Sequence, residues 1–209
     1  MRHIFKEQAP HNLSRFIERE NPRLWSEIHT STFYPHLYDE CLAQLCKEQS
    51  NLSGYTEKPL PSQTKSLHID HFRKRSLFPI RDYVFGWDNL LADEHNINYG
   101  ADYKDNMISS VVAYQKLVNS VVHDPHHFFT YMENGHIVPR RQLGSVEREI
   151  AEYTISVFNL QHPSLVNKRE EIIRIVRSYL QGGLTSDDLK ACLGDYGFPS
   201  VVEYALQQL

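Results

Sequence analysis

The sequence predicts a mainly α-helical protein with one small β-ribbon near residues 67–87. Apolar residues recur at helical spacing in the first 50 residues and again from about Asn98 onward, whereas apolar and polar residues alternate near the ribbon. The chain has 209 residues, of which 41% are hydrophobic and 23% are charged, so a globular domain with a proper core is expected. No uninterrupted apolar run approaches about 18 residues, which argues against a membrane span.

The first 50 residues are expected to form an N-terminal helical segment. Five of their apolar residues recur at the spacing of one helix face. They are Leu37, Cys41, Leu42, Leu45 and Cys46. The segment from Asn51 to Gln63 contains Gly54, Pro59 and Pro61, which favour a loop or a short ribbon.

Two short strands make up the expected ribbon. The stretch from Leu67 to Phe72 alternates between apolar and polar residues, as a half-buried strand does. A loop over Arg73–Ser76 follows, and the second strand is expected at Tyr83–Phe85. We place both strands within a central segment, residues 51–122, between the N-terminal segment and a C-terminal helical region, residues 123–209.

The rest of the chain is expected to be helical, with one interruption. From about Asn98 to Val121, five residues share one helix face. They are Met107, Val111, Tyr114, Val118 and Val121. Residues 123–139 are expected to form a loop or a hairpin around Asn134 and Gly135. Further helices are expected to begin near residues that favour helix starts. These residues are Ser145, Pro163, Thr185 and Ser200.

The residues that carry chemistry lie between His68 and Asp105. Asp70 and His71 end the first strand, Asn89 lies in the block Trp87–Leu91, and Asn98 follows Asn89 by nine positions, since 98 − 89 = 9. This pattern resembles the HNH nuclease motif, a ββα-metal finger. The resemblance implies an HNH finger embedded in a helical domain.

These residue types suit the hydrolysis of a phosphodiester bond. A neutral imidazole has an unperturbed pKa of about 6.5, close to operating pH, so His71 would activate the water. Asp70 and Asn98 offer hard oxygen ligands for one Mg²⁺ or Mn²⁺ ion, which would neutralise charge on the leaving oxygen. Asn89 is expected to accept a hydrogen bond from the imidazole of His71 and to fix its tautomer. Because adjacent strand residues point to opposite faces, a twist at the strand end would be needed for Asp70 and His71 to serve one phosphate.

Four further residues are candidates for substrate binding. His68 lies on the same strand face as Asp70 and would support the ion or a phosphate, although a structural role is equally consistent with its position. Arg73, Lys74 and Arg75 follow the strand and would clamp the nucleic-acid backbone, unless they form only a solvated loop. The net charge of −4 argues against an autonomous nucleic-acid-binding module.

The resemblance extends beyond the motif. Leu67–Arg73 and Tyr83–Leu91 resemble the HNH subunit of Septu and retron-associated antiphage systems, the PtuB family. Ala151–Ile155 and Asn159–Arg169 resemble a helical segment of that family, so the similarity spans about Asn51 to Arg177. The resemblance implies an effector nuclease that works with a PtuA-type ATPase. In retron systems it also implies a reverse transcriptase and its RNA–DNA product as partners.

One departure from the family pattern concerns zinc. Such proteins usually carry two Cys-x-x-Cys pairs that hold a structural zinc around the finger. Other residues occupy all four cysteine positions here. They are Ser53, Thr56, Glu94 and Ile97. We therefore expect no structural zinc, and a hydrogen-bonded plug in its place, with Tyr55 and Phe72 filling the remaining space. Cys41 and Cys46 are expected in the core.

Three functions remain open at this point. The first is a metal-dependent endonuclease effector, the second is a catalytically silent scaffold, and the third is a nucleic-acid-binding subunit. The intact set of Asp70, His71, Asn89 and Asn98 favours the first. The three cysteines of the chain and the lack of an apolar secretory stretch at its start lead us to expect a cytoplasmic protein.

The C-terminal residues 184–209 lie outside the ββα finger and are not required to build its site. Five of their apolar side chains would form a docking face for the ATPase, or equally part of the core. They are Leu189, Leu193, Phe198, Val202 and Leu206.

Overall fold

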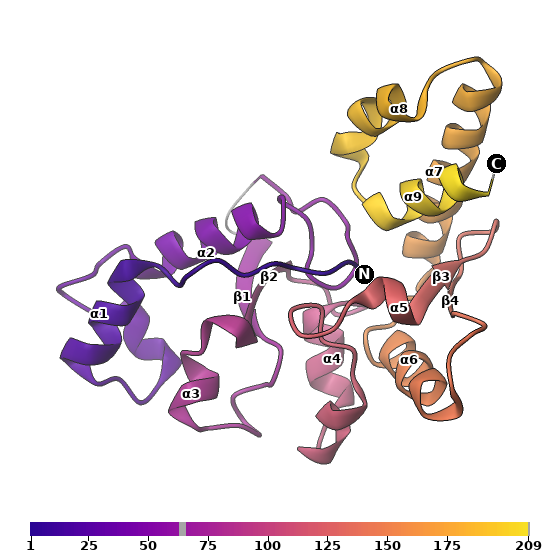
Figure 1. The fold of residues 1–209 in the computed structure, drawn as a ribbon. Helices are drawn as coiled ribbons and strands as arrows, with labels where there is room; N and C mark the ends of the chain where they lie inside the picture. The colour runs from indigo at the N-terminus through magenta and orange to yellow at the C-terminus, as the bar shows by residue number, and fades with distance from the viewer. Residues whose placement is uncertain (63–65, 209) are drawn as a thin grey trace.

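The computed structural model describes residues 1–62 and 66–208 (Figure 1). The α-helices are α1 (His11–Glu20), α2 (Leu37–Glu48), α3 (Arg81–Val84), α4 (Ala101–Met107), α5 (Pro125–Phe128), α6 (Ser145–Val157), α7 (Pro163–Gln181), α8 (Ser186–Leu193) and α9 (Pro199–Gln207). The strands are β1 (Leu67–His71), β2 (Leu90–Glu94), β3 (Phe129–Tyr131) and β4 (Ile137–Pro139). Short 3-10 helices are η1 (Trp25–His29), η3 (Trp87–Asn89), η4 (Val112–Lys116) and η5 (Gly194–Tyr196). The predicted class, mainly α with a small β-ribbon, is confirmed. The last residue of the loop expected over 51–63 lies outside the described residues.

The ribbon consists of β1 and β2, which pair antiparallel with His71 opposite Leu90 and His68 opposite Asp93. The first strand was predicted correctly, but the second was not, because Tyr83 and Val84 belong to the helical turn α3. The actual strand, β2, does not alternate, since its first four residues are buried on both faces. A strand covered on both sides carries no period-two signal.

Two hydrophobic clusters cover the two faces of this ribbon. The smaller cluster joins Ile69, Leu90 and Ala92 to the apolar faces of α1 and α2, including the buried Cys41. The larger cluster contains Leu91 and continues into the C-terminal helices. In Figure 1, α1 and α2 lie on one side of β1 and β2, while α4 and α6 lie on the other. Successive residues of β1 therefore point into two different environments.

The helix expected from Asn98 is shorter than predicted. It begins at Ala101 and ends at Met107, and Ile108 is already extended. The ammonium of Lys74 donates to the carbonyls of Asp105 (2.7 Å) and Ile108, which satisfies the end of the helix. The apolar repeat beyond this point continues into the 3-10 helix η4 and loops.

The hairpin expected around Asn134 and Gly135 is present as β3 and β4. Gly135 has φ of +78°, and a Cβ at this position would lie 2.1 Å from the carbonyl oxygen of Val166 in α7. Only glycine allows this left-handed turn to pack so closely against the helix.

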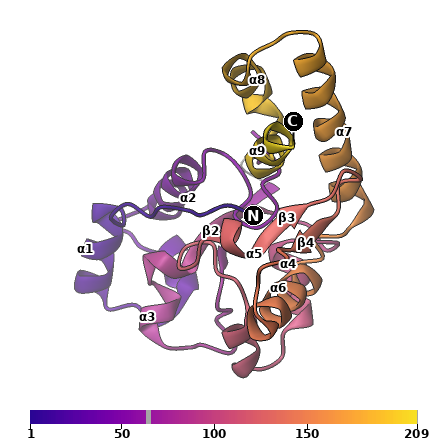
Figure 2. The same ribbon diagram turned by 45° about the vertical axis from the view of Figure 1, so that its right-hand side comes forward.

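The C-terminal helices belong to the core, so the docking face suggested for residues 184–209 is not available. Leu189, Leu193, Phe198 and Val202 are all buried, and α9 packs along α7 (Figure 2). A buried carboxylate ties this region to the loop before the ribbon. Glu57 accepts from the backbone N–H of Ser200 (2.9 Å) and forms an ion pair with the amino group of Met1 (2.6 Å).

Among the described residues, no helix combines the length and the apolar character that a membrane crossing requires.

Candidate functional site

The strand–strand–helix unit β1–β2–α4 holds most of the residues singled out from the sequence. His68 and Asp70 on β1 and Asp93 on β2 share the ribbon face that α4 covers. Asp93 accepts from the backbone N–H of Ala101 at 2.9 Å, which fixes the first turn of α4 against this face. Its buried position raises its pKa to about 7.

His71 points to the opposite face, toward the smaller cluster. Its side chain is 4% exposed, and its ring meets the ring of Trp25 edge-on at a centroid distance of 4.8 Å. Its Nε2–H donates to the carbonyl of Val84 at 2.9 Å. Burial lowers its pKa to about 4, so the ring is neutral near pH 7 with its proton on Nε2. The remaining nitrogen, Nδ1, is therefore the one that accepts a proton.

Asn89 does not contact this imidazole, so the expected tautomer contact is wrong. Its Oδ1 accepts from the backbone N–H of Arg73 (2.8 Å), and its Nδ2 donates to the carbonyls of Arg73 (3.2 Å) and Tyr83 (2.7 Å). Asn89 thus joins the loop after β1 to α3. Because Val84 is the next residue after Tyr83, Asn89 holds the carbonyl that fixes the tautomer of His71.

Asp70 is committed to a buried ion pair. Its Oδ2 accepts from the ammonium of Lys104 at 2.7 Å and from the hydroxyl of Tyr55. Lys104 has no exposed surface, and it also donates to the carbonyls of His71 (2.8 Å) and Phe72 (3.2 Å). Burial opposes ionisation of Asp70, but the neighbouring ammonium outweighs it and lowers the pKa of the carboxyl.

Asn98 lies apart from Asp70. Its side chain is exposed, its backbone N–H donates to Asn96 (2.9 Å), and its carbonyl accepts from Asn159 (2.7 Å). The shared ion expected for Asp70 and Asn98 stays a prediction. In this structure the ammonium of Lys104 occupies the position beside Asp70 that such an ion would take.

The three basic residues after β1, Arg73, Lys74 and Arg75, differ in their surroundings. Lys74 is held at the end of α4, as described above. The guanidinium of Arg73 lies 4.9 Å from the ring centroid of Tyr83, beside a cleft of about 330 Å³ that Asn89 also lines. Arg75 is exposed. Of the three residues in this basic run, Arg73 and Arg75 are the ones whose charge faces open space.

The turn at residues 53–56, where the resemblance led us to expect a plug in place of zinc, is built from hydrogen bonds. The hydroxyl of Ser53 accepts from the backbone N–H groups of Tyr55 (3.2 Å) and Thr56 (3.1 Å), and both Ser53 and Thr56 are buried. The ammonium of Lys58 pairs with Glu94 at 2.7 Å and so ties this turn to the end of β2. The hydrogen-bonded plug is present, but Ile97 is 74% exposed and plays no part in it.

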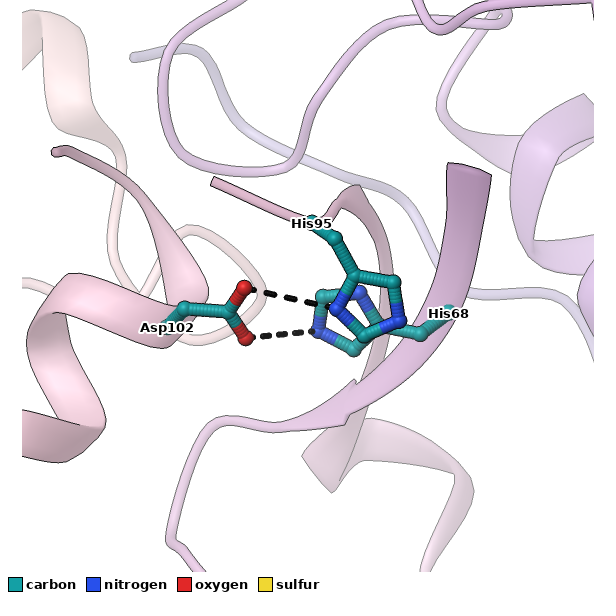
Figure 3. A group of neighbouring side chains, drawn as sticks. All are labelled: His68, His95 and Asp102. Atoms are coloured by element: carbon teal, nitrogen blue, oxygen red, sulfur yellow. Dashed lines mark hydrogen bonds and ion pairs between the residues drawn. The ribbon is translucent and has the colours of Figure 1, made fainter. Parts of the chain in front are cut away.

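Sequence reasoning missed a cluster of three ligand-type side chains on the same unit (Figure 3). His68 from β1, His95 from the residue after β2 and Asp102 from α4 each offer a ligand atom within 4.8 Å of the others. His68 was selected as a candidate, but His95 and Asp102 were not. They become visible only when the pairing of His68 with Asp93 is known, because that register places His95 diagonally across from His68.

A scan against models of known protein families and a search of curated proteins found no match to this chain.

Proposed function

We propose that this protein is an HNH-type endonuclease that hydrolyses nucleic-acid phosphodiester bonds as the effector of an antiphage defence complex. The observation that carries the proposal is the state of His71 at the end of β1. Its ring is neutral, and its Nε2 proton is held by the carbonyl of Val84 at 2.9 Å. The order of β1, β2 and α4 and the motif resemblance support the same assignment.

The chemical role of His71 follows from this tautomer. Nδ1 would take a proton from water while the water oxygen attacks phosphorus. The bond to the leaving oxygen would break, and that oxygen would take a proton from solvent. Asn89 is a positioning residue, since it holds the loop after β1 to α3. Arg73 and Arg75 would contact the phosphate backbone of the substrate.

A divalent ion, Mg²⁺ or Mn²⁺, would neutralise the charge on the leaving oxygen. The residues around Asp70 do not fit such an ion in the observed arrangement. The ammonium of Lys104 already donates hydrogen bonds to the carboxylate of Asp70 and to the carbonyls of His71 and Phe72. An ion bound by Asp70 would require the Lys104 side chain to leave. We therefore assign no step of the reaction to an ion at this carboxylate.

The proposed partners rest on the resemblance to the PtuB family. They are a PtuA-type ATPase, a nucleic-acid substrate and, in a retron setting, the reverse transcriptase with its RNA–DNA product. The proposed setting is the cytoplasm.

A second candidate function is a catalytically silent subunit of the same complex. The specific observation in its favour is the buried ion pair between Lys104 and Asp70, which places a lysine ammonium against the carboxylate expected to bind the ion. The small exposure of His71, 4%, points the same way.

Cleavage assays separate the two functions. Plasmid DNA and structured RNA are incubated with the protein, with and without the ATPase, in Mg²⁺ or Mn²⁺. The endonuclease proposal expects cutting by wild type and a loss of at least about a hundredfold in His71→Asn. His127→Asn, an exposed histidine outside the unit, is the matched control and should cut normally. Cutting by His71→Asn within a few-fold of wild type would refute the assigned base, and no cutting by wild type in any combination would favour the silent subunit.

A further inference from the structure

Three side chains that commonly bind metals converge at one edge of the β1–β2–α4 unit. The carboxylate of Asp102 faces the edges of two imidazoles, with Oδ1 3.7 Å from His68 Nε2 and Oδ2 3.3 Å from His95 Nδ1. In Figure 3 both rings present a nitrogen to this carboxylate from the same side. The rings are stacked at a centroid distance of 4.1 Å and an angle of 14°.

These separations match the spacing of ligands around an ion. Bonds of about 2.0–2.1 Å from a tetrahedral ion to nitrogen or oxygen place neighbouring ligand atoms roughly 3.3–3.4 Å apart. The observed 3.3 Å and 3.7 Å are close to this value, although they reach the two different oxygens of Asp102. One ligand atom from each residue lies within 4.8 Å of the others, so the stacked rings would have to rotate toward a common point to bind one ion.

His68 also lacks the hydrogen bonds that a structural histidine makes. Among residues 1–62 and 66–208 its buried Nδ1 has no partner, and the 3.7 Å between its Nε2 and Asp102 is too long for a hydrogen bond. Its side chain is only 16% exposed, so water cannot readily replace both partners.

We propose that His68, His95 and Asp102 form a binding site for a first-row transition-metal ion of the Zn²⁺ class. Two imidazoles and one carboxylate favour such ions over Mg²⁺ or Ca²⁺, which prefer oxygen ligands alone. His95 is 59% exposed and Asp102 is 29% exposed, so the ion would keep open positions for water or a ligand.

This site shares His68 with the ion site considered from the sequence, but it uses neither Asp70 nor Asn98. It also uses none of the positions where the resembling family carries its cysteine pairs. It also lies on the ribbon face opposite His71, because residues 68 and 71 are three apart on one strand. The inference therefore does not rest on the proposed hydrolase activity.

Metal titration of the full-length, tag-free protein tests the site. After chelator treatment and desalting, we expect calorimetry to detect about one Zn²⁺ per chain and no comparable Mg²⁺ binding. Saturating Zn²⁺ should raise the melting temperature by roughly 5–10 °C. His95→Ala and Asp102→Asn should each weaken Zn²⁺ binding at least about tenfold and reduce the thermal shift.

The matched control is His127→Ala, which removes an exposed histidine that pairs with one carboxylate, Glu147, at 2.8 Å. It should bind Zn²⁺ like wild type. Substitution with Co²⁺ identifies the ligands. A thiolate-to-cobalt band in the visible spectrum would place the ion at a cysteine, and we expect no such band. Three results would each overturn the proposal. They are absence of Zn²⁺ binding to wild type, an affinity of His95→Ala and Asp102→Asn for Zn²⁺ that equals that of wild type, and a thiolate-to-cobalt band.

Discussion

Asp70→Asn is expected to destabilise the protein strongly, because it leaves the Lys104 ammonium buried without its closest counter-ion. Lys104 has no exposed surface, and its Nζ lies 2.7 Å from Asp70. Removing one partner of a buried ion pair costs about 3–5 kcal/mol. Asp105, at 3.1 Å, and two backbone carbonyls remain beside the ammonium, so we expect the lower end, about 3 kcal/mol. For a chain of this length that corresponds to a fall in melting temperature of roughly 6–12 °C.

Urea unfolding followed by circular dichroism measures this effect. The exposed Asp88→Asn is the matched control and should change stability by less than about 0.5 kcal/mol. The double variant Asp70→Asn with Lys104→Met should recover part of the loss, because no unpaired charge is then buried. A loss below about 1 kcal/mol in Asp70→Asn would refute the buried pair. Such a result would mean that Lys104 does not hold Asp70, so that the carboxylate would be available to bind a metal ion.

Three further outcomes are expected from the structure. Burial lowers the pKa of His71 from 6.5 to about 4, so its stabilising contribution is present above pH 6.5 and is lost as the pH falls toward 4. The stability of wild type relative to His71→Asn should therefore shrink by up to about 3 kcal/mol over that range in urea titrations, and a pH-independent difference would contradict the assignment. Gly135→Ala should cost at least about 2 kcal/mol, because its Cβ would clash with α7, whereas Gly183→Ala, with φ of +91° and no atom within 4 Å, should cost only about 1 kcal/mol. Equal losses would exclude the clash as the cause. Chelator-treated protein should keep a cooperative thermal transition, since the turn at Ser53 is held by hydrogen bonds, and unfolding on chelation alone would show that a metal maintains the fold.

The sequence predicted the elements that carry a distinct local pattern. Polar and apolar residues alternate in β1 although its last three residues are all buried, and the Asn134-Gly135 pair located the second hairpin. By contrast, β2 carries Leu90, Leu91 and Ala92 in succession, because hydrophobic clusters cover both of its faces. Its continuous apolar run has no periodicity that would separate it from a helix, so the strand was placed several residues too early.

The candidate site was only partly predictable for a related reason. Spacing along the chain identified Asp70, His71 and Asn89, but it says nothing about a distant partner such as Lys104, which lies 34 positions from Asp70. The contact of His71 is likewise a backbone carbonyl, and any residue type at position 84 would supply it. The roles of side chains in this unit thus depend on the packing of α3 and α4, which no local motif encodes.

The most direct test of the proposed function is the pH dependence of cleavage by the protein together with the proposed ATPase partner. With His71 as the base, the single-turnover rate should be nearly constant from pH 6 to 8 and should fall as the pH approaches about 4, where His71 becomes protonated. His71→Asn should show no cleavage across the range. A fall in rate centred near 6.5 would point to an ordinary exposed histidine as the base, and an absence of wild-type cleavage at every pH would contradict the proposal that this unit is a nuclease.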